Sequence, residues 1–122
     1  MATGPETRAV AKILKALRFR GAYVEKIHGG AYQAAGIPDL LGMDERGGFG
    51  IEVKDPAKIT ADFTASEREA IAGLRSDGIL CGTAGGCTPL QASHIRRILK
   101  SGNRAGVATS VAEAIEILEE AL

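Results

Sequence analysis

Four short segments of this chain carry the same helix-start signal, and together they limit the folds that it can adopt. Each segment reads Ser or Thr, then two residues, then Glu or Gln. This is the capping box, in which two side chains bind free backbone N–H groups at the start of a helix. The boxes lie at residues 3–6, 64–67, 88–91 and 110–113. Apolar residues at helical spacing follow each box, so we predict four helices.

Strand-like segments separate these helices. Five of them combine β-branched or alternating apolar residues with glycine-containing breaks. The predicted strands cover residues 23–28, 39–43, 49–54, 79–83 and 105–109. The second and third form a hairpin around residues 44–48, and the later strands extend its sheet. With 122 residues, the chain fits a single α/β domain that spans residues 1–122.

The net charge does not indicate a partner. Fifteen basic and fifteen acidic residues cancel, so any nucleic-acid surface depends on how the charges are distributed. Two basic clusters stand out because acidic residues concentrate in the last predicted helix. They are Lys12, Lys15, Arg18 and Arg20, and Arg96, Arg97, Lys100 and Arg104. Such faces are commonly only solvated, and the alternative is that one cluster contacts phosphate.

The cysteines and the apolar runs favour a protein of the cytoplasm. Cys81 and Cys87 are too few for a disulfide framework, and no secretory signal precedes them. We expect Cys81 to be a small core residue in a strand. No apolar run reaches the roughly 18 residues of a membrane span, so no membrane association is expected.

Three residues form the pattern that carries chemistry. Glu52 and Lys54 are two apart in a predicted strand and therefore project from the same face. Asp39 follows Pro38 at the start of the neighbouring strand, within reach of the same place. Two carboxylates beside a lysine suit a hard divalent cation such as Mg²⁺ or Mn²⁺. The alternative is an exposed Glu–Lys pair with an unrelated turn aspartate.

Three separated motifs resemble a known family. Residues 36–40 (GIPDL) followed by 51–54 (IEVK) are similar to the PD-(D/E)xK nuclease superfamily. Residues 26–33 (KIHGGAYQ) and the closing run 88–118 more closely resemble the small stand-alone VRR-NUC domains of phages and bacteria. The resemblance covers about residues 6–54 and 88–118.

This resemblance implies a restriction-endonuclease-like core of helix, three-stranded meander, helix and strand. It also implies a metal site at Asp39, Glu52 and the backbone carbonyl of Val53, with Mg²⁺ or Mn²⁺ as cofactor. The implied activity is DNA cleavage, often on branched or flapped DNA. Stand-alone members are expected to be homodimers, which would suit two symmetric cuts at a four-way (Holliday) junction.

The resemblance also suggests secondary site residues, each with a structural alternative. Glu6 and Gln91 are candidate catalytic residues, but each also completes a predicted capping box. The candidate nucleic-acid contacts are Lys26, His28, Tyr32 and Gln33. Tyr32 offers a ring for stacking on a base, although a lone histidine such as His28 is usually structural.

One segment departs from the family pattern. Residues 55–87 separate the lysine from the Thr-x-x-Gln helix, as an inserted helix–strand unit. A shift of 24 positions superposes this unit on the segment that follows it, through either duplication or a shared helix–strand pattern. The insertion leaves open whether Gln91 or Glu67 occupies the family's glutamine position. We predict a metal-dependent, structure-selective DNA endonuclease, against a restriction-type or exonucleolytic enzyme and a catalytically inactive nucleic-acid-binding module or assembly subunit.

Overall fold

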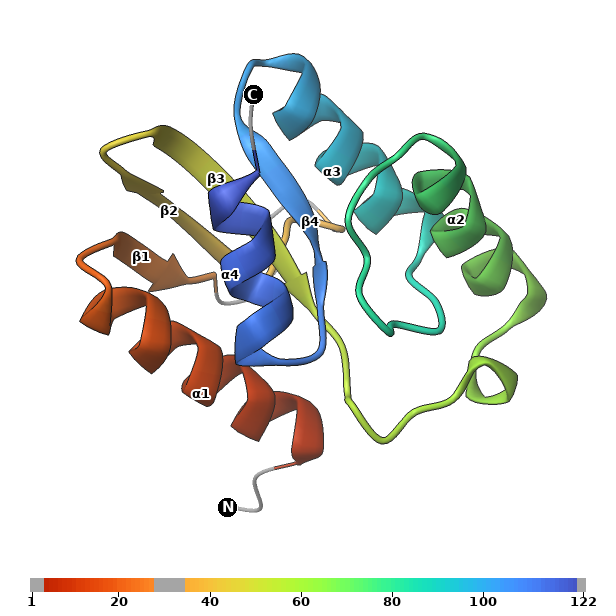
Figure 1. Ribbon diagram of the computed structural model, residues 1–122. Coiled ribbons are helices and arrows are strands. Elements are labelled where there is room, and N and C mark those ends of the chain that lie inside the picture. Colours follow the sequence, from red (N-terminus) through yellow and green to blue (C-terminus); the bar gives the residue numbers. More distant parts are fainter. Residues whose placement is uncertain (1–3, 28–34, 121–122) are drawn as a thin grey trace.

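Over residues 4–27 and 35–120, which the computed structural model describes, the chain forms four α-helices and four strands (Figure 1). The helices are α1 (Pro5–Phe19), α2 (Ala65–Ser76), α3 (Pro89–Lys100) and α4 (Val111–Glu119), with a short 3-10 helix at Thr60–Asp62. The strands are β1 (Tyr23–Lys26), β2 (Leu40–Asp44), β3 (Gly47–Val53) and β4 (Arg104–Ala108). The predicted mixed α/β fold with four helices is confirmed.

The strands form one sheet in the order β1-β2-β3-β4. The first three strands are an antiparallel meander, and β4 pairs with β3 in parallel. A two-residue turn joins β2 to β3, and Gly47, at φ +117°, enters β3 with a backbone conformation that suits glycine. The register pairs Leu40 with Ile51 and Val53 with Ala108. The start of β2 and the C-terminal ends of β3 and β4 therefore lie at the same end of the sheet.

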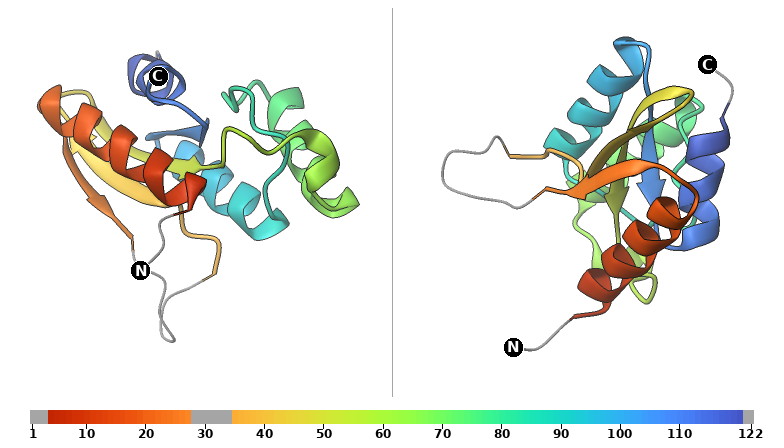
Figure 2. Two further views of the ribbon diagram at one scale, coloured as in Figure 1. Left: turned by 90° about the horizontal axis from the view of Figure 1, so that it is seen from below. Right: turned by 90° about the vertical axis from the view of Figure 1, so that its left-hand side faces the viewer.

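Helices cover both faces of the sheet (Figures 1 and 2). On one face, α1 and α4 lie side by side and bury a core that includes Ile13, Ile51 and Ile117. On the other face, α3 packs on β3 and β4, with α2 beside it, around Ile95 and Val107. Because side chains alternate along a strand, the side chain of Glu52, which follows Ile51 in β3, points toward the α3 side.

The predicted strand at residues 79–83 is wrong. This segment is irregular, and a single backbone hydrogen bond, from Val107 N–H to the Leu80 carbonyl (2.9 Å), links it to β4. Gly82, at φ +50°, turns the chain away before a ladder can form. The internal similarity therefore ends after the glycine turn that follows each helix, at Gly78 and Gly102.

The predicted capping boxes differ in outcome. Those at 64–67 and 88–91 are complete. At 110–113, Ser110 Oγ accepts from Glu113 N–H, but the Glu113 carboxylate binds Thr109 and Thr83 instead of closing the box. The box at 3–6 is wrong, because α1 begins at Pro5 with Gly4 as N-cap and no side-chain capping bond. Proline at the first helical position has no N–H that needs a partner.

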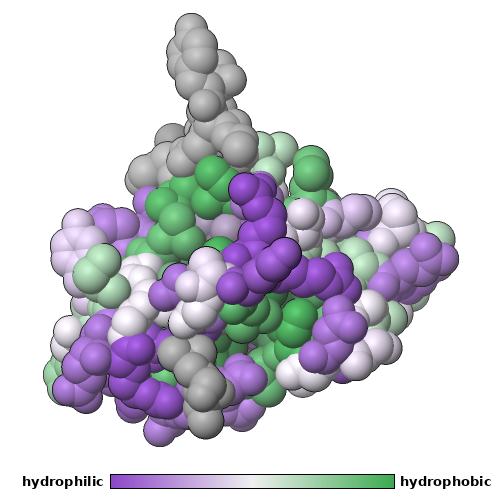
Figure 3. Space-filling view, turned by 90° about the horizontal axis from the view of Figure 1, so that it is seen from above, coloured by the Kyte–Doolittle hydropathy of each residue, from purple (hydrophilic) through white to green (hydrophobic). Residues whose placement is uncertain are grey.

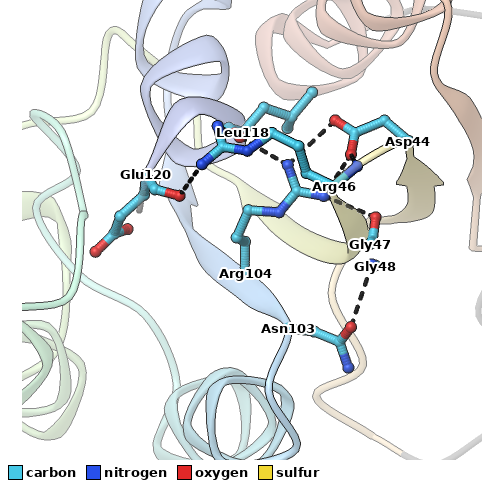
Figure 4. Close-up of polar contacts among 8 residues, drawn as sticks. All are labelled: Asp44, Arg46, Gly47, Gly48, Asn103, Arg104, Leu118 and Glu120. Atoms are coloured by element: carbon cyan, nitrogen blue, oxygen red, sulfur yellow. Dashed lines mark hydrogen bonds and ion pairs between the residues drawn. The ribbon is translucent and has the colours of Figure 1, made fainter. Parts of the chain in front are cut away.

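Arg104 is not part of a basic surface. Its side chain is fully buried and donates to both carboxylate oxygens of Asp44 (2.7 and 3.1 Å) and to the carbonyls of Gly47 and Leu118 (Figure 4). Arg46 donates to the Leu118 and Glu120 carbonyls beside it (Figure 4). The Arg104 guanidinium lowers the pKa of Asp44 by hydrogen bonding. This network ties the β2–β3 hairpin to the end of α4.

The surface carries several exposed apolar side chains. Tyr23 and Met43 are paired across β1 and β2, on a part of the sheet that α3 does not cover, and are 65% and 58% exposed. Seen from above, hydrophobic areas are interrupted by a band of hydrophilic side chains (Figure 3). Within the part of the chain that is described, no helix is long and apolar enough to cross a membrane.

Candidate active site

Asp39, Glu52 and Lys54 meet at the end of the sheet where β2 begins and β3 ends. Asp39 lies one residue before β2, and its Oδ2 accepts from the N–H of Val53 (2.9 Å). Glu52 projects from β3 toward the α3 side, and Lys54 follows on the same face because its own N–H continues the pairing with β4, donating to the Ala108 carbonyl (3.0 Å). The predicted convergence of these three residues is what the structure shows.

The site is buried and unevenly charged. Glu52 is 2% exposed and Lys54 9% exposed. The Lys54 ammonium lies 3.6 Å from Glu52 Oε2. Burial raises the pKa of Glu52 to about 9, the neighbouring Asp39 carboxylate adds to the rise, and Lys54 opposes it. One lysine therefore does not compensate the acidic groups around it, and without a further cation Glu52 holds a proton at neutral pH.

Gln91 completes the cap of α3 and also binds two residues of the candidate site. Its Oε1 accepts from the Thr88 N–H (2.8 Å), which completes the cap of α3, and also from Lys54 Nζ (2.9 Å). Its Nε2 donates to Glu52 Oε2 (3.0 Å). Glu67 instead closes the box of α2 through Thr64. Of the two candidates, Gln91 is therefore the one bonded to the site.

Glu6 completes a cluster of three carboxylates. One oxygen each from Glu6, Asp39 and Glu52 lies within 4.8 Å of the others, a spacing that a metal ion could bridge. Glu6 reaches this place from the first turn of α1, where it takes part in no capping box. Partial burial, followed by the Asp39 charge, raises the pKa of Glu6. The Val53 side chain packs in the α1–α4 core, so Val53 can contribute to the site only through its backbone.

The predicted nucleic-acid contacts are only partly described. Lys26 is half-buried at the end of β1 and pairs with Leu40, next to Asp39. His28, Tyr32 and Gln33 lie outside the described residues. The sequence patterns did not single out Lys58, whose charge, like that of Lys54, opposes the rise in the pKa of Glu6. Lys58 lies within residues 55–87, where no motif marked it as close to the acidic residues.

Comparison with known proteins supports this architecture. No family model and no curated protein matches the sequence. The four helices and the four-stranded sheet of the described residues make a mixed α/β fold. A solved structure described as a "VRR_NUC domain" superposes with a TM-score of 0.61 at 19% sequence identity, covering 98% of this chain and 100% of that chain. This confirms the predicted resemblance to VRR-NUC domains at the level of the fold.

Proposed function

We propose that this protein is a metal-dependent DNA endonuclease that hydrolyses phosphodiester bonds. Its proposed active site contains Asp39, Glu52 and Lys54. The observation that carries the proposal is the cluster of Glu6, Asp39 and Glu52 oxygens within 4.8 Å, beside the Lys54 ammonium. A cluster of like charges around a buried carboxylate such as Glu52 is unfavourable unless a cation or protons neutralise it. The VRR_NUC fold supports a nuclease-type domain for this arrangement.

The donor set fits a hard divalent cation. Every candidate ligand is an oxygen, and such sites suit Mg²⁺ or Mn²⁺ better than softer metals. Asp39 and Glu52 would hold the cation, with the Val53 carbonyl as a further ligand. Hydrogen bonding from Val53 N–H engages only one Asp39 oxygen. A cation bound here would supply charge stabilisation and a more acidic water.

The protein's own residues divide the remaining work. Lys54 brings a positive charge to the place where the attacked phosphate gains negative charge, and it can orient the attacking water. Gln91 holds the Lys54 ammonium and the Glu52 carboxylate in fixed positions through its amide. Glu6 is exposed at the open side of the cluster, where it can accept a hydrogen bond from an incoming water.

A cleavage assay tests the proposal. Wild type, Glu52→Gln and Lys54→Ala are incubated with Mg²⁺ or Mn²⁺ and labelled single strand, duplex, flap or four-way junction. We expect wild type to cut and both variants to lose at least about a hundredfold in rate. Arg97→Ala, an exposed charge change on α3, is the matched control and should cut like wild type.

Substrate selectivity and assembly are finer parts of the same proposal. The resemblance to VRR-NUC domains supports a preference for branched or flapped DNA and a homodimer, and the two unpaired cysteines, Cys81 and Cys87, favour a location in the cytoplasm. Unequal rates on the four substrates, and sedimentation at twice the monomer mass, would support the first two points. If wild type binds DNA but cuts none of the substrates with either metal, the protein is a nucleic-acid-binding module and the enzyme proposal fails.

A further inference from the structure

Two adjoining hollows form a groove between α1 and α4. Its first part is a hollow of about 510 Å³ whose lining includes Arg8 and Lys12 of α1, Asp55 and Val111. Pro5 and Asp55, which line this hollow, directly precede Glu6 and directly follow Lys54, and the charge of Asp55 acts on Glu6. This end of the groove is therefore the one nearer the candidate active site. A second hollow, of about 610 Å³, shares Lys12 and Val111 with the first and continues along the two helices. The two helices lie side by side on this face (Figure 1).

The α1 wall of this groove is basic. Arg8, Lys12, Lys15 and Phe19 are spaced by four, three and four residues, which places them in one row along the helix. The row extends over about 16 Å at the rise of an α-helix. Among the described residues, Lys12 and Lys15 form no ion pair, and Asp55 is the only acidic side chain lining either hollow.

The far end of the groove has apolar side chains along it, beside Lys15 and Arg20. Ala16, Val111 and Ile115 line the second hollow, and Phe19 stands at its rim with 93% of its surface exposed. A phenylalanine so exposed has no packing role within the described chain. An aromatic ring at the end of a basic row is the arrangement that binds unstacked bases in single-stranded nucleic acid.

The opposite wall disfavours a duplex. α4 contains no basic residue, and it contributes only Val111 and Ile115 to the lining of the two hollows. Only the α1 side can therefore neutralise phosphates, which matches a single backbone. The two strands of a duplex would also keep their bases away from Phe19.

We propose that the α1–α4 groove binds a single-stranded DNA arm that leaves the candidate active site, with phosphates on Lys12 and Lys15 and a base stacked on Phe19. This rests on the proposed nuclease function and adds a binding surface to it, for the single-stranded arm of the branched or flapped DNA proposed above. Arg18, which was grouped with these residues in the sequence, lies on another side of α1 and donates to the Val24 carbonyl.

Binding measured without cleavage tests this groove. Fluorescence anisotropy with a labelled oligothymidylate, in EDTA and at several salt concentrations, compares wild type with Lys12→Ala/Lys15→Ala and Phe19→Ala. We expect each variant to bind about tenfold more weakly. The lysine variant should also lower the slope of log affinity against log salt by about 1.4, since two phosphate contacts are lost. Phe19→Tyr should restore binding, and blunt duplex should bind wild type and variants alike.

Matched variants separate this site from general charge effects. Arg97→Ala/Lys100→Ala removes two exposed charges from α3, and Ile59→Ala truncates another exposed apolar residue. Both should bind single strand within about twofold of wild type. The inference is overturned if these controls lose as much affinity as the groove variants, or if wild type does not bind single strand. It is also overturned if Phe19→Ala instead dissociates a dimer, as sedimentation would show. Wild type that binds in the groove but cuts nothing would refute the nuclease and leave the groove standing.

Discussion

Gln91 connects the start of α3 to the two charged groups of β3. Its amide oxygen accepts two hydrogen bonds and its amide nitrogen donates one to Glu52. An amide can do both, whereas a carboxylate can only accept when ionised. The capping role alone does not require glutamine, because Glu67 fills the equivalent position in the box of α2.

Replacing Gln91 with glutamate therefore separates capping from site chemistry. Gln91→Glu keeps the α3 cap but places a negative charge against Glu52, which raises the Glu52 pKa further. We expect a melting temperature within a few degrees of wild type, a cleavage rate about tenfold lower, and a rate–pH profile displaced to higher pH. Glu67→Gln, the reciprocal change in α2, should leave the profile in place. Equal displacement by both variants would show that Gln91 has no special position.

Local sequence patterns predict some contacts of these residues and miss others. Strand alternation and the hairpin placed Asp39, Glu52 and Lys54 together, because both are local properties of the chain. The contact from Gln91 spans 39 residues to Glu52 and depends on how α3 docks, which no local pattern specifies. The sequence places Arg104 in a basic cluster with its neighbours. Its partner, Asp44, is 60 residues away, so no local pattern predicts that Arg104 is buried and paired.

At the scale of elements, Arg104 fixes the hairpin to the end of α4. Its guanidinium reaches Asp44, Gly47 and Leu118 from the first residue of β4. Arg104→Met should lower the free energy of unfolding by about 3 kcal/mol, since the Asp44 carboxylate then loses its buried partner. Arg46→Met, which removes a neighbouring exposed arginine, should cost less than about 1 kcal/mol. Urea unfolding at neutral pH measures both, and similar losses would contradict the buried network.

Residues 55–87 contain a second contact between elements, from Phe63 to Gly86. A Cβ on buried Gly86 would lie 2.6 Å from the Phe63 ring, so Gly86→Ala should destabilise the protein by about 1–3 kcal/mol. Gly73, inside α2, offers the opposite case, because a Cβ there meets only the flexible end of Arg96 at 3.2 Å. Gly73→Ala should stabilise by about 0.5–1 kcal/mol. Urea unfolding of the two variants tests the sign, and a neutral Gly86→Ala would mean that residues 55–63 do not pack on 84–87.

Helix–strand alternation predicts the class of fold correctly, but within residues 55–87 it also predicts a strand that does not form. The capping boxes and apolar spacing of α2 and α3 are local and were read correctly. The segment after α2 has the composition of a strand, and it follows the same glycine turn as β4 does. The chain bends at Gly82, and Thr83 binds Glu113 instead of continuing along β4. Such contacts depend on tertiary structure, which overrides local propensity.

At the scale of the whole molecule, the site's uncompensated charge couples stability to pH. The pKa of Glu52 is about 9 in the folded protein and near 4.5 when it is exposed. The folded state therefore binds the extra proton between these values, and this contribution to stability is complete below pH 4.5 and lost as pH rises toward 9. Without metal, we expect the melting temperature to fall over this window, and Glu52→Gln to remove that part of the fall.

A bound cation should reverse this dependence. Because Mg²⁺ or Mn²⁺ needs ionised Glu52, binding releases its proton, and affinity rises with pH up to about 9. A ligand that binds only the folded state raises the melting temperature, so the increase produced by saturating metal should be larger at pH 8.5 than at pH 6. Glu52→Gln should show no such increase, whereas Glu116→Gln, an exposed change on α4, should behave like wild type. If metal still raises the melting temperature of Glu52→Gln, the cation binds elsewhere. The carboxylate cluster at the end of β3 would then be stabilised by protons alone.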